Sequence, residues 1–337
     1  MKKETIQLGV NGFGRIGKLV CRMLLSDKNF NLVQINDPMS AEMIAHLLKY
    51  DSLHGQFEAE IQHGENYISV NGEKIAVTNF TNPAQIPWNE NKVNIVVDSS
   101  GKFKTASSLE GHLKMGAETV ILSSPAGDSS VERSVVMGLN HKSISLDDKI
   151  ISNSSCTTNC VAIVLEVLFR HFGVKTAFMN TVHPFTNNQN LQDGFHKDMR
   201  RARSAFNNII PTTTSAIEAT KLIYPELKNN FDGFATRVPV ADCSFVELVA
   251  KLKTKVDVET INSAFLKESK GDLKKYLEYT KDPIVSSDVQ RNRHSAIFDS
   301  QLTRVLDDDL IQIVAWYDNE TGYSARIVDL IKYISDL

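Results

Sequence analysis

The fold is decided near the N-terminus by the stretch IQLGVNGFGRIG, residues 6–17, which runs on into the amphipathic segment KLVCRMLL. This order predicts an apolar strand, a glycine-rich turn and a helix. We expect Gly12 to permit the tight turn, Gly14 to let the backbone approach a pyrophosphate, and Gly17 to allow close helix packing. Asp37 ends the next apolar run, twenty residues beyond Gly17, where a carboxylate can accept the hydroxyls of an adenosine ribose. The stretch therefore predicts a dinucleotide-binding unit.

Short β-branched runs alternate with helical stretches as far as residue 155. The predicted strands after the first are 32–35, 93–98, 119–123, 135–137 and 150–151. Strands that alternate with helices are typical of a doubly wound, largely parallel sheet, so we predict a Rossmann-type α/β domain.

The hydrophobic pattern changes after Cys156, where longer strands with alternating apolar residues are predicted at 176–182, 234–238, 245–252 and 310–317. They indicate a mixed or antiparallel sheet in a second, α+β catalytic domain. Its early strands are separated by a long loop, about 184–211, of the kind that is usually functional or disordered. A terminal amphipathic helix is predicted over 325–336. The predicted domains are 1–155 plus 320–337 for the dinucleotide, and 156–319 for catalysis.

Composition excludes several classes of function. The 337 residues carry a formal net charge of −3, which gives no electrostatic basis for binding nucleic acid as the principal role. No apolar run reaches the 18 residues of a membrane span, and no signal peptide is predicted. The four cysteines form neither a disulfide framework nor a paired zinc pattern, so we expect a cytoplasmic protein without a metal.

The segment SSCTTNC, residues 154–160, places Cys156 at the opening turn of a predicted helix. Unpaired N–H groups and the helix dipole favour an anion there, so a thiolate nucleophile is the first hypothesis. The alternative is a buried structural cysteine. Cys160 lies one helical turn further on, and we expect a structural role for it.

Five blocks together resemble the phosphorylating glyceraldehyde-3-phosphate dehydrogenase family, in order and over essentially the whole chain. They are NGFGRIG at 11–17, LLKYDSLHG at 47–55, SCTTNC at 155–160, NIIPTTT at 208–214 and WYDNETGY at 316–323. The resemblance implies that the Cys156 thiolate adds to an aldehyde and that hydride then passes to NAD, leaving a thioester. Inorganic phosphate would release it as an acyl phosphate. His183, in NTVHPFT at 180–186, matches the catalytic histidine.

The resemblance also implies the remaining roles and a homotetramer. The cofactor would be bound by Gly12, Phe13, Gly14, Arg15, Ile16, Gly17, Asp37, Ser123, Asn319 and Tyr323. Thr186 and Arg237 would hold the phosphate of the aldehyde substrate, and Ser155, Thr157, Arg201 and Thr214 the attacking phosphate, with Ser215 beside them. The alternative for Tyr323 is a buried aromatic without a cofactor contact.

The sequence departs from the family pattern at Ser215, where glycine is usual, and at Asn188, where aspartate is frequent. A side chain at position 215 can crowd the phosphate site, unless its hydroxyl supplies a new hydrogen bond. Gly194-Phe195 is also unusual. Asp37 should repel a ribose 2′-phosphate and favours NAD over NADP. The alternative functions are an erythrose-4-phosphate dehydrogenase, which would hydrolyse its thioester, and a non-catalytic binding paralogue.

Overall fold

The computed structural model describes residues 6–131 and 133–337, which form two compact units. The first unit contains the described residues up to Val135, together with His141–Ser154 and Ser324–Leu337. The second contains Val136–Asn140 and Ser155–Tyr323. Within the described residues, no helix is both long and apolar enough to cross a membrane.

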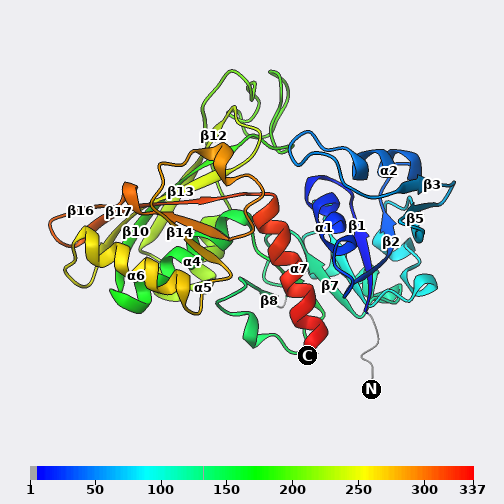
Figure 1. The fold of residues 1–337 in the computed structure, drawn as a ribbon, viewed down its shortest axis with the longest axis horizontal. Coiled ribbons are helices and arrows are strands. Elements are labelled where there is room, and N and C mark those ends of the chain that lie inside the picture. Colours follow the sequence, from blue (N-terminus) through cyan, green and yellow to red (C-terminus); the bar gives the residue numbers. More distant parts are fainter. Residues whose placement is uncertain (1–5, 132) are drawn as a thin grey trace. The chain divides into compact units, whose positions relative to one another are not determined.

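The sheet of the first unit is built around β1, Gln7–Asn11, which pairs in parallel with β2, Asn31–Asn36, on one side and β6, Ile95–Asp98, on the other (Figure 1). Across the described residues its order is β3-β4-β5-β2-β1-β6-β7-β9-β8. The other strands are β3 Ile61–His63, β4 Tyr67–Val70, β5 Glu73–Thr78, β7 Thr119–Leu122, β8 Arg133–Ser134 and β9 Ile150–Ser152. Because β1 leads to neighbours on both sides, the carboxyl ends of β1 and β6 mark the topological switch point, where open α/β sheets bind ligands.

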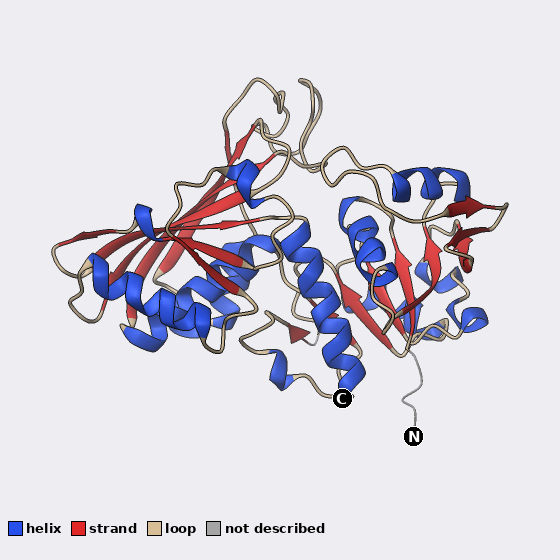
Figure 2. Ribbon diagram, viewed as in Figure 1, coloured by secondary structure: helices blue, strands red, loops and turns tan. Residues whose placement is uncertain are grey.

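Helices complete this unit, and its predicted α/β class is confirmed (Figure 2). They are α1 Arg15–Leu25, α2 Ala41–Lys49, α3 Ala106–Lys114, the greater part of α7 Thr321–Asp336, and three short 3₁₀ helices, Pro83–Gln85, Trp88–Asn91 and His141–Ser143.

One predicted strand, 135–137, is wrong. Strand β8, which pairs with β9, ends at Ser134, and the chain then turns at residues 137–140, with Gly138 at φ +95°. Val135, Val136 and Met137 are all buried, and such an apolar run cannot be told from a buried strand by its pattern.

The second unit contains a mixed sheet, as predicted. Its order is β11-β12-β10-β13-β17-β15-β14, and β16 pairs with β17. The strands are β10 Val174–Pro184, β11 Ile210–Thr212, β12 Phe231–Val238, β13 Ser244–Leu252, β14 Leu277–Thr280, β15 Ala296–Asp299, β16 Arg304–Leu306 and β17 Leu310–Tyr317. The helices are α4 Cys156–His171, α5 Ala216–Ile223 and α6 Val258–Lys270, with 3₁₀ turns at Pro225–Leu227, Ser286–Val289 and Ser300–Leu302. Strand β10 runs parallel to β12 and antiparallel to β13.

The three α-helices gather on one face of this sheet (Figure 2). Alternate residues of β13, such as Val246 and Leu248, are buried, whereas Val249 and Lys251, which point to the other face, are exposed. Phe178 and Phe234, on β10 and β12, are exposed as well. The face away from the helices is therefore partly apolar and open to solvent in the single chain.

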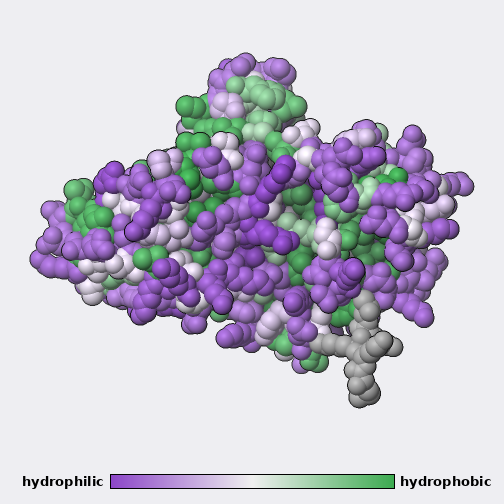
Figure 3. All heavy atoms as spheres, viewed as in Figure 1, coloured by the Kyte–Doolittle hydropathy of each residue, from purple (hydrophilic) through white to green (hydrophobic). Residues whose placement is uncertain are grey.

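The long loop predicted at about 184–211 is confirmed between β10 and β11, where residues 185–209 form no helix or strand. Its side chains Phe195 and Met199 are 93% and 87% exposed. Figure 3 shows green hydrophobic residues among the purple ones in the lobe that the loop forms at the top of the view.

The terminal helix α7, Thr321–Asp336, begins four residues before the predicted start. The cause is Asp318, whose Oδ1 atom accepts hydrogen bonds from the N–H groups of Glu320 at 2.9 Å and Thr321 at 2.7 Å. A side chain that caps these N–H groups extends the helix into a segment that the apolar periodicity does not mark.

Candidate active site

Cys156 is the first residue of α4, as predicted. The helix begins there because Ser155 caps it, with its Oγ accepting a hydrogen bond from the Thr158 N–H at 3.0 Å. The Cys156 Sγ atom lies 3.6 Å from the Nε2 atom of His183 on β10. The sequence therefore brings a thiol and an imidazole, 27 residues apart, into contact.

His183 and Arg237 are paired residues on the neighbouring strands β10 and β12. The Arg237 Nη1 atom donates to His183 Nδ1 at 2.6 Å and to the Pro184 carbonyl at 2.8 Å. The Nδ1 atom also lies 2.9 Å from the Pro184 carbonyl, so both contacts hold this side of the ring and leave Nε2 facing the thiol. Burial, together with the charge of Arg237, lowers the pKa of His183 to about 3, so the ring stays neutral at physiological pH.

The helix terminus alone does not make the Cys156 thiol acidic, contrary to the expectation from the sequence. Burial raises the pKa of Cys156, and the charge of Arg237 and a hydrogen bond from Thr157 offset this only in part. The nitrogen of His183 that faces the sulfur is Nε2, and Arg237 lies against the other nitrogen of the same ring. Activation of the thiol therefore depends on the histidine and arginine that the fold supplies.

Tyr317 is a site residue that the sequence analysis missed. Its hydroxyl is hydrogen-bonded to Thr157 Oγ1 at 2.8 Å and to Thr181 Oγ1 at 2.9 Å, and the edge of its ring packs against His183 with centroids 6.3 Å apart. It thus ties the first turn of α4 to β10. Its position in the block at 316–323 was the available signal, but no pattern in the sequence gave it a partner.

The basic residue Arg201 is directed at the threonine segment, as expected for a phosphate site. Its Nε atom donates to Thr212 Oγ1 at 2.8 Å and its Nη2 atom to the Thr213 carbonyl at 2.9 Å. Thr212 is on β11, which pairs with the strand that carries Arg237. The like charge of Arg201 lowers the pKa of Arg237, after the larger effect of burial, so the two guanidinium groups lie close enough to interact.

The other predicted phosphate residues surround the start of α5 or lie in the long loop. Thr214 Oγ1 accepts from the Ala216 N–H at 3.2 Å, and Thr186 Oγ1 accepts from the Asn188 N–H at 3.4 Å. Ser215 is exposed and has φ −69°, so its backbone is unstrained and does not need glycine. Among the described residues, none of these three hydroxyls is hydrogen-bonded to Cys156, and their roles stay predictions.

The glycine segment of the first unit has the geometry that the sequence predicts. Gly12 has φ +93°, and a Cβ on Gly17 would lie 2.0 Å from the Gly12 carbonyl oxygen. A Cβ on Gly14 would meet nothing within 4 Å, so its backbone faces open space. A pocket of about 180 Å³ opens beside Gly12, Gly14 and Asp37. The Asp37 carboxylate is held in place by the N–H groups of Phe13 at 2.7 Å and Met39 at 3.0 Å.

The side chain of Arg15 is engaged within the chain, since its guanidinium makes two hydrogen bonds to the buried carboxylate of Asp51, at 2.5 and 3.2 Å. Lys18 pairs with the same carboxylate. Ser123 follows β7 and donates its N–H to the Asp98 carbonyl at 2.9 Å. Contacts of Arg15 and Ile16 with a pyrophosphate would therefore be made by the backbone at the start of α1.

The two predicted nicotinamide residues, Asn319 and Tyr323, belong to the second unit. Asn319 is 8% exposed, and its Oδ1 atom accepts from the Ser244 hydroxyl at 3.0 Å. Tyr323 lies in the first turn of α7 and is 5% exposed. Burial of the ring is compatible with both interpretations made from the sequence, so the role of Tyr323 stays a prediction.

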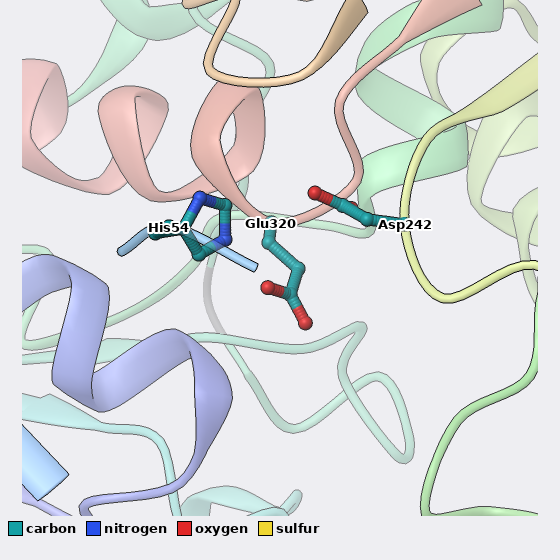
Figure 4. Close-up of side chains that lie close together, drawn as sticks. All are labelled: His54, Asp242 and Glu320. Atoms are coloured by element: carbon teal, nitrogen blue, oxygen red, sulfur yellow. The ribbon is translucent and has the colours of Figure 1, made fainter. Parts of the chain in front are cut away.

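A buried acidic group in the second unit has a structural explanation. Asp242, Cys243 and Asp318 have ligand-type atoms within 4.8 Å of one another, and Figure 4 shows Asp242 with the neighbouring carboxylate of Glu320. Asp318 accepts from three backbone N–H groups, one of them that of Arg291 at 2.7 Å, and so caps α7. Burial and these carboxylates raise the pKa of Cys243, which excludes it as a second nucleophile.

Comparisons with known proteins match the chain in two segments, one in the first unit and one in the second. Residues 6–106 match the model of the glyceraldehyde 3-phosphate dehydrogenase NAD binding domain, and residues 155–319 match that of the C-terminal domain. The chain is 44% identical over 331 residues to glyceraldehyde-3-phosphate dehydrogenase 2 of Bacillus subtilis, covering 98% of this chain and 97% of that protein. It is 46% identical to glyceraldehyde-3-phosphate dehydrogenase of Streptomyces coelicolor, covering 98% and 99%, and 44% identical to that of Geobacillus stearothermophilus, covering 98% of each.

Proposed function

This chain belongs to the glyceraldehyde-3-phosphate dehydrogenase family, and from that premise we propose that it oxidises D-glyceraldehyde 3-phosphate to 1,3-bisphosphoglycerate with NAD and inorganic phosphate. The observation that carries the proposal is the Cys156 Sγ atom 3.6 Å from His183 Nε2, in a chain that also has a glycine-lined dinucleotide pocket. A thiol hydrolase or a binding protein would leave one of these two features unused.

The reaction begins when the Cys156 thiolate donates an electron pair to the aldehyde carbon and the carbonyl pair moves to oxygen. His183 Nε2 faces this centre, so it can accept the thiol proton as the sulfur attacks, pass it to that oxygen, and take it back when the C–H bond breaks. The carbonyl then re-forms, hydride departs with the bonding pair, and a thioester remains on Sγ. An oxygen of inorganic phosphate attacks the thioester and expels the Cys156 thiolate, which restores the enzyme.

The residues of the first unit fit NAD, which supplies the acceptor for the hydride when it is bound. The backbone at Gly12 and Gly14 would hold the pyrophosphate, because Gly14 faces open space. The Asp37 carboxylate would accept the ribose hydroxyls and repel a 2′-phosphate. The Ser99 hydroxyl is enclosed and has no hydrogen-bond partner among the described residues, so it is available to a ligand.

Two anion sites are required by this reaction, and the second unit carries cations for both. Arg237 with Thr186 would hold the phosphate of the substrate, and Arg201 with Thr214 the attacking phosphate. Ser155, Thr157 and Ser215 would complete the second site, and Asn319 with Tyr323 would bind the nicotinamide. The contact between Arg201 and the threonine segment supports this assignment.

The test is NADH formation by the purified protein with glyceraldehyde 3-phosphate, with and without inorganic phosphate, beside erythrose 4-phosphate. We expect fast, phosphate-dependent reduction with the triose, and a loss of at least about a thousandfold in Cys156→Ser. Cys160→Ser is the matched control, because that buried cysteine lies one turn further along α4 and should leave turnover largely unchanged. Phosphate-independent turnover that favours the tetrose would contradict the proposal and support erythrose-4-phosphate dehydrogenase.

We also propose that the protein is a cytoplasmic homotetramer. Exposed apolar side chains on the outer face of the second sheet, Phe178, Phe234 and Val249, and in the long loop, Phe195 and Met199, support association. The four free cysteines favour a reducing compartment. Light scattering at micromolar concentration should give a mass four times that of the chain, and a monomer at that concentration would refute the assembly.

A further inference from the structure

A row of buried polar side chains crosses three adjacent strands at the switch point of the first sheet. Asn36, Asn11 and Asp98 are the last residues of β2, β1 and β6, and they stand opposite one another in register. Asn36 Nδ2 donates to Asn11 Oδ1 at 2.8 Å, and Asn11 Nδ2 donates to Asp98 Oδ2 at 2.7 Å. The three side chains are between 1% and 4% exposed. We call Asn36, Asn11 and Asp98 the strand-end row.

The strand-end row forms part of the dinucleotide pocket and holds two of its walls. Asn11 and Asn36 line the pocket, as do Phe80 and Ser100. Phe80 donates its N–H to Asn36 Oδ1 at 3.0 Å, and Ser100 donates its N–H and its hydroxyl to Asp98 Oδ1 at 3.1 and 2.7 Å. A movement of Asp98 would therefore be transmitted to both sides of the pocket.

The glycine turn is in direct contact with one of these walls. A Cβ on Gly12 would lie 2.6 Å from the Cα atom of Ser100, so the two backbones touch with no room between them. A shift of the Ser100 segment by a few tenths of an ångström would displace the turn that approaches the pyrophosphate. The position of Asp98, which fixes Ser100, thus determines the geometry of the glycine turn.

Asp98 is itself held from behind by a histidine. His112, on α3, is 0% exposed, and its Nε2 atom lies 3.1 Å from Asp98 Oδ2. Trp88 Nε1 lies 2.9 Å from the other ring nitrogen, Nδ1. An indole N–H can only donate, so Nδ1 accepts and the neutral ring carries its hydrogen on Nε2, aimed at Asp98. Trp88 therefore selects the tautomer that His112 needs to bind the carboxylate.

Asp98 depends on this contact because no Lys or Arg side chain pairs with it among the described residues. Its carboxylate is 1% exposed and accepts hydrogen bonds from Asn11, His112 and both donors of Ser100. A buried carboxylate that loses one of its donors moves toward the ones that remain or draws in water.

We propose that His112, with its tautomer set by Trp88, is a positioning residue for dinucleotide binding that acts through Asp98 and the strand-end row. The inference rests on the proposed function, since it concerns the same pocket. His112 and Trp88 are absent from the lining of that pocket, so their effect on the ligand is exerted through the row.

The experiment is calorimetric titration of the full-length protein with NAD. His112→Leu removes the donor to Asp98, and we expect the dissociation constant to rise on the order of tenfold. His112→Gln restores an N–H donor of similar reach and should bring it back to within about threefold of wild type. In steady-state assays, His112→Leu should raise KM for NAD and leave kcat at saturating NAD within about twofold.

The matched control is Leu109→Ala, on the same helix. Leu109 is 0% exposed in an apolar cluster with Val120 and Leu122 and has no part in the polar contacts of Asp98. It should lower thermal stability and leave the affinity for NAD unchanged. If His112→Leu fails to fold, Trp88→Phe keeps a ring in place while removing its N–H, and we expect a rise of about threefold.

An affinity of His112→Leu equal to that of wild type would overturn the inference, as would an equal loss in Leu109→Ala or no recovery in His112→Gln. An unchanged affinity for NAD in Trp88→Phe would show that Trp88 has no part in the positioning of His112. NAD binding by wild type without aldehyde oxidation would overturn the proposed function alone. Absence of NAD binding by wild type would overturn both.

Discussion

Replacement of Arg237 by leucine tests how the thiol of Cys156 becomes reactive. Arg237 is the cation whose charge most opposes the effect of burial on the pKa of Cys156, and it acts across the His183 ring. The 3.6 Å from Sγ to Nε2 and the 2.6 Å from Nδ1 to Nη1 put the charge at most about 8 Å from the sulfur. At an effective dielectric constant near 20, a unit charge at that distance stabilises a thiolate by about 2 kcal/mol.

This free energy corresponds to a tenfold to thirtyfold change in the population of thiolate, after allowance for screening. The sign follows from the charge: without the guanidinium the pKa of Cys156 rises, so less thiolate exists at neutral pH. The assay is the rate of alkylation by iodoacetamide between pH 6 and 10 in phosphate-free buffer. Arg237→Leu should react about ten times more slowly at pH 7, and its rate should reach its plateau at a higher pH.

Arg201→Leu is the control, because it removes the same charge from the same unit at a side chain that is hydrogen-bonded to Thr212 and Thr213 and not to His183. Its alkylation rate should stay within about twofold of wild type. If Arg237→Leu reacts as fast as wild type while Arg201→Leu is also unchanged, the view that Arg237 and His183 together stabilise the thiolate is wrong.

Three further changes test other parts of the structure. Asp37→Ala removes the acceptor that braces Phe13 N–H, so the dissociation constant for NAD should rise about tenfold and the preference over NADP should shrink, as titration with both would show. Ser215→Gly should raise KM for phosphate about threefold, because the hydroxyl proposed for the second site is lost while a backbone at φ −69° does not need glycine; an unchanged KM would remove Ser215 from that site. Although burial opposes it, hydrogen bonds from Arg15 and Lys18 hold the pKa of Asp51 below its usual range. Asp51 therefore stabilises the fold above about pH 4 and loses this effect as the pH falls further. Asp51→Asn should lower the melting temperature by about 5 °C and remove that pH dependence. An unchanged melting temperature would contradict the role given to this ion pair.

The elements that the sequence predicted best are those with strong local signals. The glycine turn at 12–17 follows from backbone freedom, and the helix at Cys156 begins where a serine can cap it. The strand predicted at 310–317 is β17 to the residue, because alternation over eight positions has few alternative interpretations. The apolar pattern gave a wrong strand at 135–137, where three buried residues stand at the point in the sequence at which the chain leaves the first unit and enters the second.

The contacts between site residues could not be predicted from the sequence pattern. His183 and Arg237 are 54 residues apart and meet because β10 and β12 pair in parallel at that register. Tyr317 reaches Thr157 across 160 residues, and no local propensity encodes such a distance. Burial raises the pKa of Cys156, whereas the sequence indicated only that a helix begins at this residue.

The sequence by itself determined the family, the α/β and mixed-sheet architecture, the helix start at Cys156 and the glycine segment, because these rest on local backbone preference and on motifs that are contiguous in the chain. Only the tertiary structure decided which groups act on one another: His183 Nε2 facing the Cys156 sulfur, the charge of Arg237 behind that ring, and the support of Asp98 by His112 and Trp88. Proton positions and pKa values are set by neighbours in space and by exclusion of water, and both arise only when distant strands come into register.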